Sequence, residues 1–541
     1  MSRRVLAAVV LLATACTGVD AASFRPPSAE AHRGGVLTVG ITAPGSVDPG
    51  NDYEPAGDLV IRTMCDTLVT TDPRDGSLRA GLAESWIVAD GGAKLVLRLR
   101  EGLRFSDGSK LTAADVAYSL SRVASADFAS QGADQLQLVA GFPEIHGDKE
   151  TDSDSARRRL AGVSSPDERT VEIALSREYG DFVRILATRL TAPVSRRAAE
   201  ADPRGFSRSP VCVGPYRLAA PFEAGATSLR LVRSRAYLPA DSGLTGGGSS
   251  YADEIRFQVY PSPNAVAAAA AAGKVDVGAA RPSDVVDVQS GPGPEVEYIG
   301  LPADTPPFDK PEVRRALALA LSRTELVQRV FPTTRVPATG FLPSTTGAAQ
   351  PCDALPAGGE PGGAVSLLAK AGVDLQGVRL PLYVNQEFRN AELVAEVARQ
   401  WREVLGVDAV LAPLTYSAFL GRGRATRGFR APFRYSWSAA DIDGYLTPLF
   451  SSDAVGRDNL SRFSDPDLDE ALERRAWRAT EPADRRLAYR HIVDLVCTQM
   501  PMIPLTNALH RYVMAARLGS ASGLFVDGST GQPLLRELFV R

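Results

Sequence analysis

The chain has 541 residues, of which 44% are hydrophobic and 23% are charged, and its formal net charge is −3. This length exceeds what a single hydrophobic core usually serves, so two or more domains are expected. The slightly acidic balance argues against a nucleic-acid partner, because phosphate binding needs a surplus of lysine and arginine.

The first segment is typical of a signal peptide. Arg3 and Arg4 supply positive charge, and residues 5–13 form an apolar run. A helix that spans a bilayer needs roughly 20 apolar residues, so this run is too short for a membrane anchor. We therefore predict a cleaved signal peptide over residues 1–15.

The end of this segment is similar to a bacterial lipobox, in which a cysteine follows small residues. Cys16 has that place, although Ala13 stands where leucine is usual. We expect a lipid on Cys16, a flexible tether over residues 16–33, and a mature protein held on the outer face of the bacterial cytoplasmic membrane or in the periplasm. Ordinary cleavage near Ala22, which gives a freely secreted protein, is the alternative.

The next informative region predicts a strand, a tight turn and a capped helix. Lys94–Arg100 alternates apolar and polar residues as a strand does. Asp107 and Gly108 form a turn pair, because glycine accepts a positive φ. Thr112 precedes Asp115 by three residues, which is close to the capping box that starts a helix.

The second half of the chain alternates helices and strands. An alternating strand is expected at 254–260, and an alanine-rich helix follows at 264–273. Further helices are predicted from apolar residues at helical spacing, at 311–330, 363–371, 390–405 and 482–499.

Several short motifs occur in one order along most of the chain. They are Gly34–Gly40 followed by Asp48-Pro49, Gly81–Trp86, the turn and helix of 105–122, Val213–Leu218, Pro307–Arg323 and Pro501–Leu505. Together they resemble the extracytoplasmic solute-binding proteins of family 5, which serve ABC importers of peptides and similar solutes.

The resemblance implies an α/β fold with two lobes, of the periplasmic-binding-protein-like kind (type II, cluster C), with a hinge and a cleft between the lobes. Lobe I is expected over residues 34–270, with an inserted subdomain at about 75–205. Lobe II is expected over 271–503, and residues 504–541 return to lobe I. Two crossings between lobes predict a hinge, since only a few backbone torsions need to change.

In the family, a Trp-Ser-Ala-Asp segment lines the cleft, and in peptide-binding members its Asp pairs with the ligand's α-amino group. Trp437 and Ser438 match this segment. Ala440 stands at the position of the Asp, and Asp441 comes one place late. The amine partner is therefore shifted to Asp441 or Asp443, or it is lost.

Two further regions are candidate ligand contacts. Arginines crowd the approach to the tryptophan, and Arg430 or Arg434 is a candidate partner for a carboxylate or phosphate on the ligand. A solvated basic loop is the alternative. By the resemblance, Tyr53 and Glu54 contact the ligand from lobe I, although surface packing also explains Tyr53.

Four cysteines follow the lipobox residue, and an even number outside the cytoplasm is compatible with disulfides. Their wide spacing does not suggest a zinc site. We favour the pairs Cys65–Cys212 and Cys352–Cys497, because each lies within one predicted lobe. Four buried free thiols are the alternative.

The sequence does not suggest an enzyme. It has four histidines, no His-Glu-x-x-His, no Gly-x-Ser-x-Gly and no phosphate loop. We expect a monomer without cofactor or metal that captures peptides or peptide-like solutes and delivers them to a membrane permease with its ATPase. The alternatives are another ligand, such as an organic anion, metal chelate, glycan or haem, and a secreted hydrolase.

Overall fold

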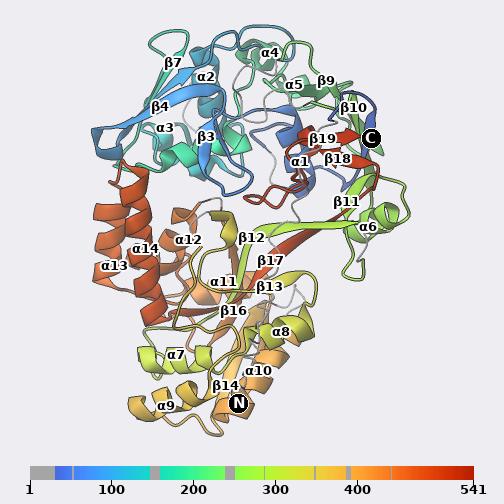
Figure 1. Cartoon of the computed structure of the whole chain (residues 1–541). Coiled ribbons are helices and arrows are strands. Elements are labelled where there is room, and N and C mark those ends of the chain that lie inside the picture. The colour runs from blue at the N-terminus through green and yellow to red at the C-terminus, as the bar shows by residue number, and fades with distance from the viewer. Residues whose placement is uncertain are drawn as a thin grey trace, which may run out of the picture.

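The computed structural model describes residues 31–541, except for 52–53, 147–158, 238–249, 285–286, 347–348, 386–390 and 440. The described chain forms two α/β lobes stacked end to end (Figure 1). The upper lobe holds β1 to β11 together with the C-terminus, and the lower lobe holds β13 to β16 with α7 to α14. The predicted two-lobed α/β fold is confirmed.

Two long antiparallel strands join the lobes, β12 (Val288–Gly300) and β17 (Met502–Met514). Val288 pairs with Val513 at the upper end, and Gly300 pairs with Met502 at the lower end. Figure 1 shows these strands crossing from one lobe to the other. The chain thus passes between the lobes twice, which is the arrangement that a hinge requires.

A single eleven-stranded sheet runs through both lobes, because β12 and β17 belong to it. From the lower lobe upward its order is β15 (Asp408–Leu414), β14 (Arg379–Asn385), β16 (Phe433–Ser438), β12, β17, β11 (Val277–Ala279), β1 (Val36–Thr42), β10 (Glu254–Tyr260), β9 (Ser228–Arg233) and β8 (Tyr216–Leu218), with β13 (Arg335–Pro337) paired to β17.

The inserted part of the upper lobe has its own four-stranded sheet, in the order β4 (Ala83–Ala89), β5 (Lys94–Leu99), β7 (Thr170–Ala174) and β6 (Val163–Ser164). The predicted capped helix is α2 (Ala113–Ala124). Thr112 donates to Asp115 Oδ2 from its backbone N–H at 3.0 Å and from its hydroxyl at 2.7 Å. The predicted capping box is therefore confirmed.

Three large hydrophobic cores organise the described part of the chain, and a small fourth cluster lies around Phe206. One lies in the lower lobe between Val296 and Leu505, one spans residues 68–213 in the inserted part, and one joins both chain ends of the upper lobe. The predicted boundaries near residues 270 and 503 stay predictions. Trp477 packs against both the lower core and the core of the inserted part, so it stands where the two lobes meet.

The lower lobe shows one correction to the predicted helices. The expected helix 311–330 is two helices, α7 (Pro311–Leu319) and α8 (Arg323–Val330). The chain breaks at Ser322, whose hydroxyl accepts a hydrogen bond from the backbone N–H of Glu325 at 3.2 Å. A serine in this place competes with the continuing helix by capping a new one.

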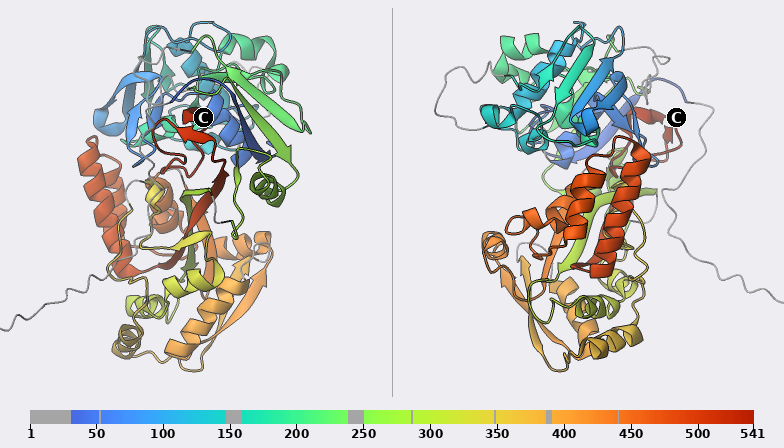
Figure 2. Two further views of the ribbon diagram at one scale, coloured as in Figure 1. Left: turned by 45° about the vertical axis from the view of Figure 1, so that its right-hand side comes forward. Right: turned by 90° about the vertical axis from the view of Figure 1, so that its left-hand side faces the viewer.

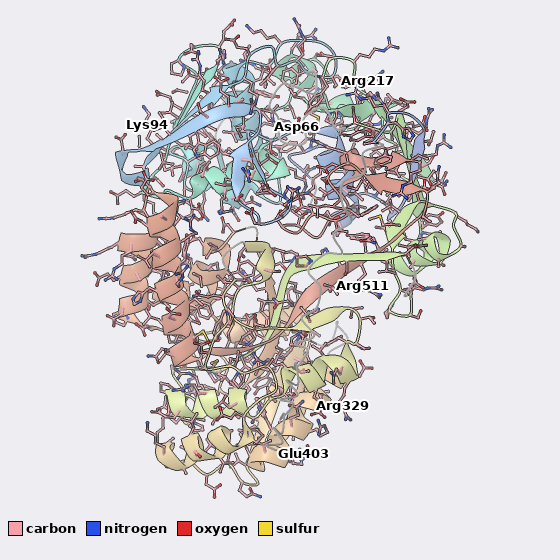
Figure 3. All side chains as sticks on the ribbon, viewed as in Figure 1. Asp66, Lys94, Arg217, Arg329, Glu403 and Arg511 are labelled. Carbon is pink, nitrogen blue, oxygen red and sulfur yellow. A yellow bond between two sulfur atoms is a disulfide. The ribbon has the colours of Figure 1, made fainter. Side chains whose placement is uncertain are left out.

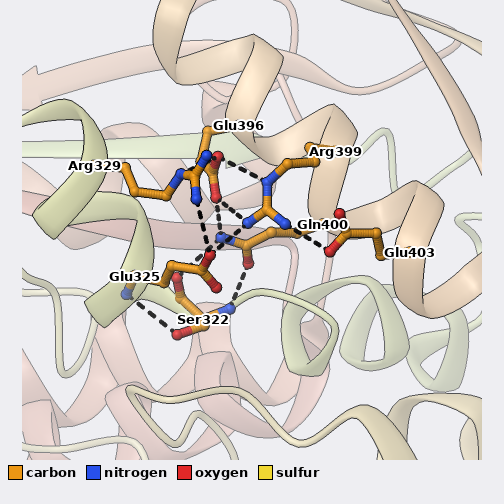
Figure 4. Close-up of polar contacts among 7 residues, drawn as sticks. All are labelled: Ser322, Glu325, Arg329, Glu396, Arg399, Gln400 and Glu403. Carbon is orange, nitrogen blue, oxygen red and sulfur yellow. Dashed lines mark hydrogen bonds and ion pairs between the residues drawn. The ribbon is translucent and has the colours of Figure 1, made fainter.

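A network of charged side chains fixes α8 against α10 (Ala391–Leu405) (Figure 4). Arg399 donates to Glu325 at 2.8 Å, to Glu396 at 2.6 Å and to Glu403 at 2.6 Å. The network lies in the lower lobe, away from the space between the lobes, as the labels of Arg329 and Glu403 show (Figure 3). We therefore assign it to the packing of the lobe and not to ligand binding.

The other helices and short strands complete both lobes. The upper lobe adds α1 (Pro55–Met64), α3 (Phe142–His146), α4 (Arg196–Ala201), α5 (Pro203–Phe206), α6 (Pro263–Ala271), β2 (Val69–Thr71), β3 (Leu78–Ala80), β18 (Leu518–Ser520) and β19 (Leu538–Val540). The lower lobe adds α9 (Pro361–Ala371), α11 (Tyr416–Arg424), α12 (Asp443–Phe450), α13 (Pro466–Glu470) and α14 (Pro482–Gln499).

The structure contains two disulfides, Cys65–Cys212 in the upper lobe and Cys352–Cys497 in the lower lobe. Their Cα atoms lie 5.5 and 5.7 Å apart, within the range that a disulfide spans. These are the two pairs that the sequence favoured. Cys16 lies outside the described residues.

Among the residues that the structure describes, none of the helices combines the length and the apolar character needed to cross a membrane.

Candidate functional site

A cavity of about 620 Å³ lies between the two lobes. Its upper wall comes from α1, the 3-10 helices Phe182–Ala187 and Arg189–Thr191, and residues 529–532. Its lower wall comes from β12, β13, β17 and the end of β16. A volume of this size suits a small solute, and both lobes line it.

The lower wall contains one residue that the sequence singled out. Ser438, at the end of β16, is exposed and lines the cavity, where it stands opposite Glu295 of β12 in the sheet. Arg335 of β13 lines the same wall and forms ion pairs with Glu295 and with Glu297. Charges on this wall are therefore matched within the protein.

Arg434 does not line the cavity, in contrast to the sequence-based expectation. It is 6% exposed, and its Nε donates to Glu297 Oε1 at 2.7 Å. Glu297 is itself 1% exposed and also accepts from the hydroxyl of Thr506 at 3.1 Å. The positive charge of Arg434 is satisfied inside the sheet, because burial of either charge alone would be costly. Arg430 is exposed.

Trp437 and Asp443 make contacts within the lower lobe and at its upper edge. The indole of Trp437 donates to the carbonyl of Gly444 at 2.7 Å. Asp443 Oδ1 accepts from the indole of Trp477 at 2.7 Å and from the hydroxyl of Thr447 at 2.8 Å. Neither Trp437 nor Asp443 belongs to the wall of the described cavity.

Asp441 is the second candidate for an amine partner, and it is 6% exposed. Its Oδ1 accepts from the backbone N–H of Gly444 at 2.7 Å. Burial, followed by the repulsion of Asp443 and Asp181, raises the pKa of Asp441 to about 7. Arg184 opposes this shift only weakly. Asp441 lies just beyond the two wall residues Ser438 and Ala439 and is not itself in the wall.

The raised pKa of Asp441 predicts how stability changes with pH. Between about pH 4 and pH 7 the folded chain keeps a proton that the unfolded chain has released. Raising the pH through this window should therefore lower the unfolding free energy, by at most about 1.4 kcal/mol per pH unit, and the loss should level off above about pH 7.

The measurement is denaturant unfolding at several pH values of the wild type and of Asp441→Asn. The difference between the two curves isolates this carboxyl from the other titrating groups. A difference that does not change between pH 4 and pH 7 would contradict the prediction.

The sequence proposed Tyr53 and Glu54 as ligand contacts from the upper lobe. Tyr53 lies outside the described residues. Glu54 is exposed and immediately precedes α1, whose first residue, Pro55, lines the cavity.

The upper wall has a charge cluster that the sequence reasoning missed. Asp58 of α1 accepts from Arg62 Nε at 2.7 Å and pairs with Arg189 Nη1 at 2.9 Å. All three line the cavity. The only local signal is the spacing of four residues between Asp58 and Arg62, which is common on helices. Arg189 comes from a distant segment.

The cavity wall has a surplus of positive charge. Four arginines and two carboxylates line it: Arg62, Arg184, Arg189, Arg335, Asp58 and Glu295. His510, at the same wall, adds no charge near neutral pH, because burial lowers its pKa. A wall of this kind favours an anionic guest.

Beside the cavity, the lobes touch each other directly. The backbone N–H of Gly180 donates to the carbonyl of Trp477 at 2.7 Å, and the guanidinium of Arg177 lies 3.8 Å from the centre of the Trp477 ring. Asp181 accepts from Arg485 of α14 at 2.8 Å in a buried contact. Figure 2 shows α13 and α14 reaching the upper lobe along one edge.

A side chamber of about 280 Å³ adjoins the main cavity within the upper lobe. The two share Arg62, Arg189 and Gln532 in their walls. Asp66, labelled in the upper lobe in Figure 3, lines the chamber, and its carboxylate receives the hydroxyl of Tyr237 at 2.6 Å. The chamber extends the space that a guest can occupy.

Comparison with known proteins gives a family match. The family model of bacterial extracellular solute-binding proteins, family 5 Middle, matches residues 77–457. The chain is 26% identical over 503 residues to the glutathione-binding protein GsiB of Escherichia coli O6:K15:H31 (strain 536 / UPEC), covering 90% of this chain and 91% of that protein.

Solved structures agree with the fold. MppA, a periplasmic murein tripeptide binding protein in an unliganded open form, superposes with a TM-score of 0.80 at 21% identity, covering 96% of this chain and 99% of that one. The clavulanic acid biosynthesis oligopeptide binding protein 2 gives a TM-score of 0.79 at 24% identity, covering 96% and 97%. At these identities the likeness concerns the fold.

Proposed function

The chain belongs to the bacterial extracellular solute-binding proteins of family 5, which serve ABC importers, and on this basis we propose that its solute is a peptide or peptide-like molecule. The family consists of binding proteins. The observation that carries the proposal is the cavity between the lobes, which takes its walls from both. A guest there contacts both lobes only when they are close, so its binding shifts the population toward the closed form.

The choice of a peptide is supported by the similar proteins. Their names describe binders of glutathione, of a murein tripeptide and of oligopeptides. The main cavity of about 620 Å³, with the side chamber of about 280 Å³, has room for a short peptide. We therefore favour a tripeptide-sized guest.

Within this complex, we assign Ser438 to hydrogen bonding with the peptide and Asp441 to its α-amino group. Burial and two neighbouring acids disfavour the charge of Asp441 in the unliganded protein. An arriving ammonium would stabilise the charged form of Asp441, since a buried charge is stable when it is paired. Glu54 and Tyr53 are proposed to contact the guest from the upper lobe.

The delivery step and the anchor belong to the same proposal. A diacylglycerol on Cys16 would hold the protein at the outer face of the cytoplasmic membrane, near the permease that receives the solute. The protein would act there as a monomer, while the permease's ATPase supplies the energy for transport. Mass spectrometry of the membrane fraction, with Cys16→Ala as the control, tests the anchor.

Binding of tripeptides tests the function. A panel of free and N-acetylated tripeptides is compared by thermal unfolding and small-angle scattering. A peptide at about one hundred times its Kd should raise the unfolding free energy by about 2.7 kcal/mol and make the particle more compact. N-acetylation should weaken binding to the wild type, and much less to Asp441→Asn.

The proposal fails if no peptide stabilises the protein while a sugar, metal chelate or organic anion does. An organic anion is the second candidate, because the positive charge of the upper wall favours it.

A further inference from the structure

We propose that the cavity selects solutes that carry a carboxylate, and that Arg62 is the residue that receives it. The inference rests on the proposed function in taking the solute to be a peptide, but the carboxylate itself can belong to a peptide terminus, an acidic side chain or a small organic acid. The chemistry that recognises it is the same in each case.

Arg62 has the position that such a role requires. It lies in the last turn of α1 and lines both the main cavity and the side chamber. Its Nε is engaged by Asp58, and among the described residues neither of its Nη atoms has a hydrogen-bond partner. Its side chain is 36% exposed. The outer edge of the guanidinium is therefore open to a two-pronged contact with a carboxylate.

Asp58 holds Arg62 in place without cancelling the charge of the cluster. Asp58 is 8% exposed, and its other oxygen lies 2.9 Å from Arg189 Nη1. One carboxylate is thus shared by two guanidiniums, and one positive charge is left over. Because Asp58 fixes the orientation of Arg62 before the solute arrives, little side-chain entropy is lost on binding.

Among the side chains that line the upper wall, Arg62, Arg184 and Arg189 stand against one carboxylate, Asp58. Asp181 lies behind this wall, where Arg184 and Arg485 share it and where Asp441 and Asp443 are its neighbours, so that group adds no further surplus. Asp527 is the next acid near Arg62, and its Oδ1 already accepts the backbone N–H of Ser529 at 2.7 Å. Even with Asp527 counted, the upper wall keeps a positive balance.

The lower wall does not have this surplus. Arg335 faces Glu295 on this wall, and behind the wall the buried Glu297 pairs with Arg335 and with Arg434, so two cations stand against two anions. The asymmetry between the walls points to a bound solute whose carboxylate lies against α1. This differs from the sequence-based expectation, which placed the anion partner at Arg430 or Arg434.

Titration calorimetry on the intact protein tests the inference with glutathione, its diethyl ester and citrate as probes. Arg62→Gln should weaken glutathione binding about ten- to a hundredfold and leave the weak binding of the diester unchanged. Arg62→Lys should recover part of the loss, because lysine keeps the charge but not the planar fork. Arg196→Gln, at an exposed ion pair on α4, is the matched control and should change nothing.

The outcomes separate this inference from the proposed function. If peptides bind but neither esterification nor Arg62→Gln changes their affinity, the role of Arg62 is overturned and the peptide function stands. If citrate binds in an Arg62-dependent way and no peptide does, the carboxylate site stands and the peptide function fails. If neither carboxylate probe binds, the inference is overturned. Unchanged melting temperatures of the variants confirm that each is folded.

Discussion

Replacing Glu297 with glutamine is expected to lower the unfolding free energy by about 3–5 kcal/mol, the cost of breaking a buried ion pair by removing one partner. Glu297 is 1% exposed and is the anion for Arg434, which is 6% exposed. It also pairs with Arg335 at 3.3 Å. Without its charge, Arg434 is left as a buried cation on β16, beside β12.

Glu295→Gln is the matched control, because Glu295 lies on the same strand and also pairs with Arg335. The side chain of Glu295 is 34% exposed, so solvent screens its charge. Its replacement should cost less than about 1 kcal/mol. Urea unfolding followed by tryptophan fluorescence measures both variants, and equal losses for the two would refute the assignment of Glu297.

Removing the Cys65–Cys212 disulfide by a double serine substitution is expected to cost about 4–5 kcal/mol. The bridge closes a loop with a sequence separation of 147 residues, and the constraint that it places on the unfolded chain grows with loop length. Both cysteines are buried in the upper lobe, at 4% and 1% exposure. The unfolding transition of the upper lobe should therefore move to lower temperature.

The second disulfide provides the comparison. Cys352–Cys497 has a nearly equal separation of 145 residues but lies in the lower-lobe core. Its removal should cost a similar free energy and affect the other lobe. Scanning calorimetry of the two double variants tests this, with non-reducing peptide mapping of the wild type to establish the pairs. Four alkylatable thiols in denatured, unreduced protein would contradict both bridges.

Local patterns were sufficient for much of the secondary structure. The capping box at Thr112 was predictable because the residues that make it lie within one helical turn. The error at Ser322 has a local cause as well: apolar spacing continues through this position, while the hydroxyl caps a new helix. Periodicity alone does not distinguish one helix from two that follow each other.

The candidate site was less predictable, because its contacts join distant segments. Ser438 was identified from a motif, and it does line the cavity. Arg434 was chosen for its sequence neighbours, yet its partner Glu297 lies 137 positions away. Arg62 belongs to no recognisable motif. It could not be identified from the sequence because the cavity wall on which it lies is built from segments that are far apart in the chain.

The sequence by itself determined the family and the two-lobed α/β fold, since motif order is a property of the chain, and it favoured the two cysteine pairs while four free thiols stayed open as the alternative. Only the tertiary structure decided which charges are satisfied and which are open. Arg434 and Arg62 carry the same guanidinium, but one is enclosed by the sheet with its own carboxylate and the other lies on a cavity wall. The electrostatic role of a side chain depends on burial and on neighbours that folding brings together.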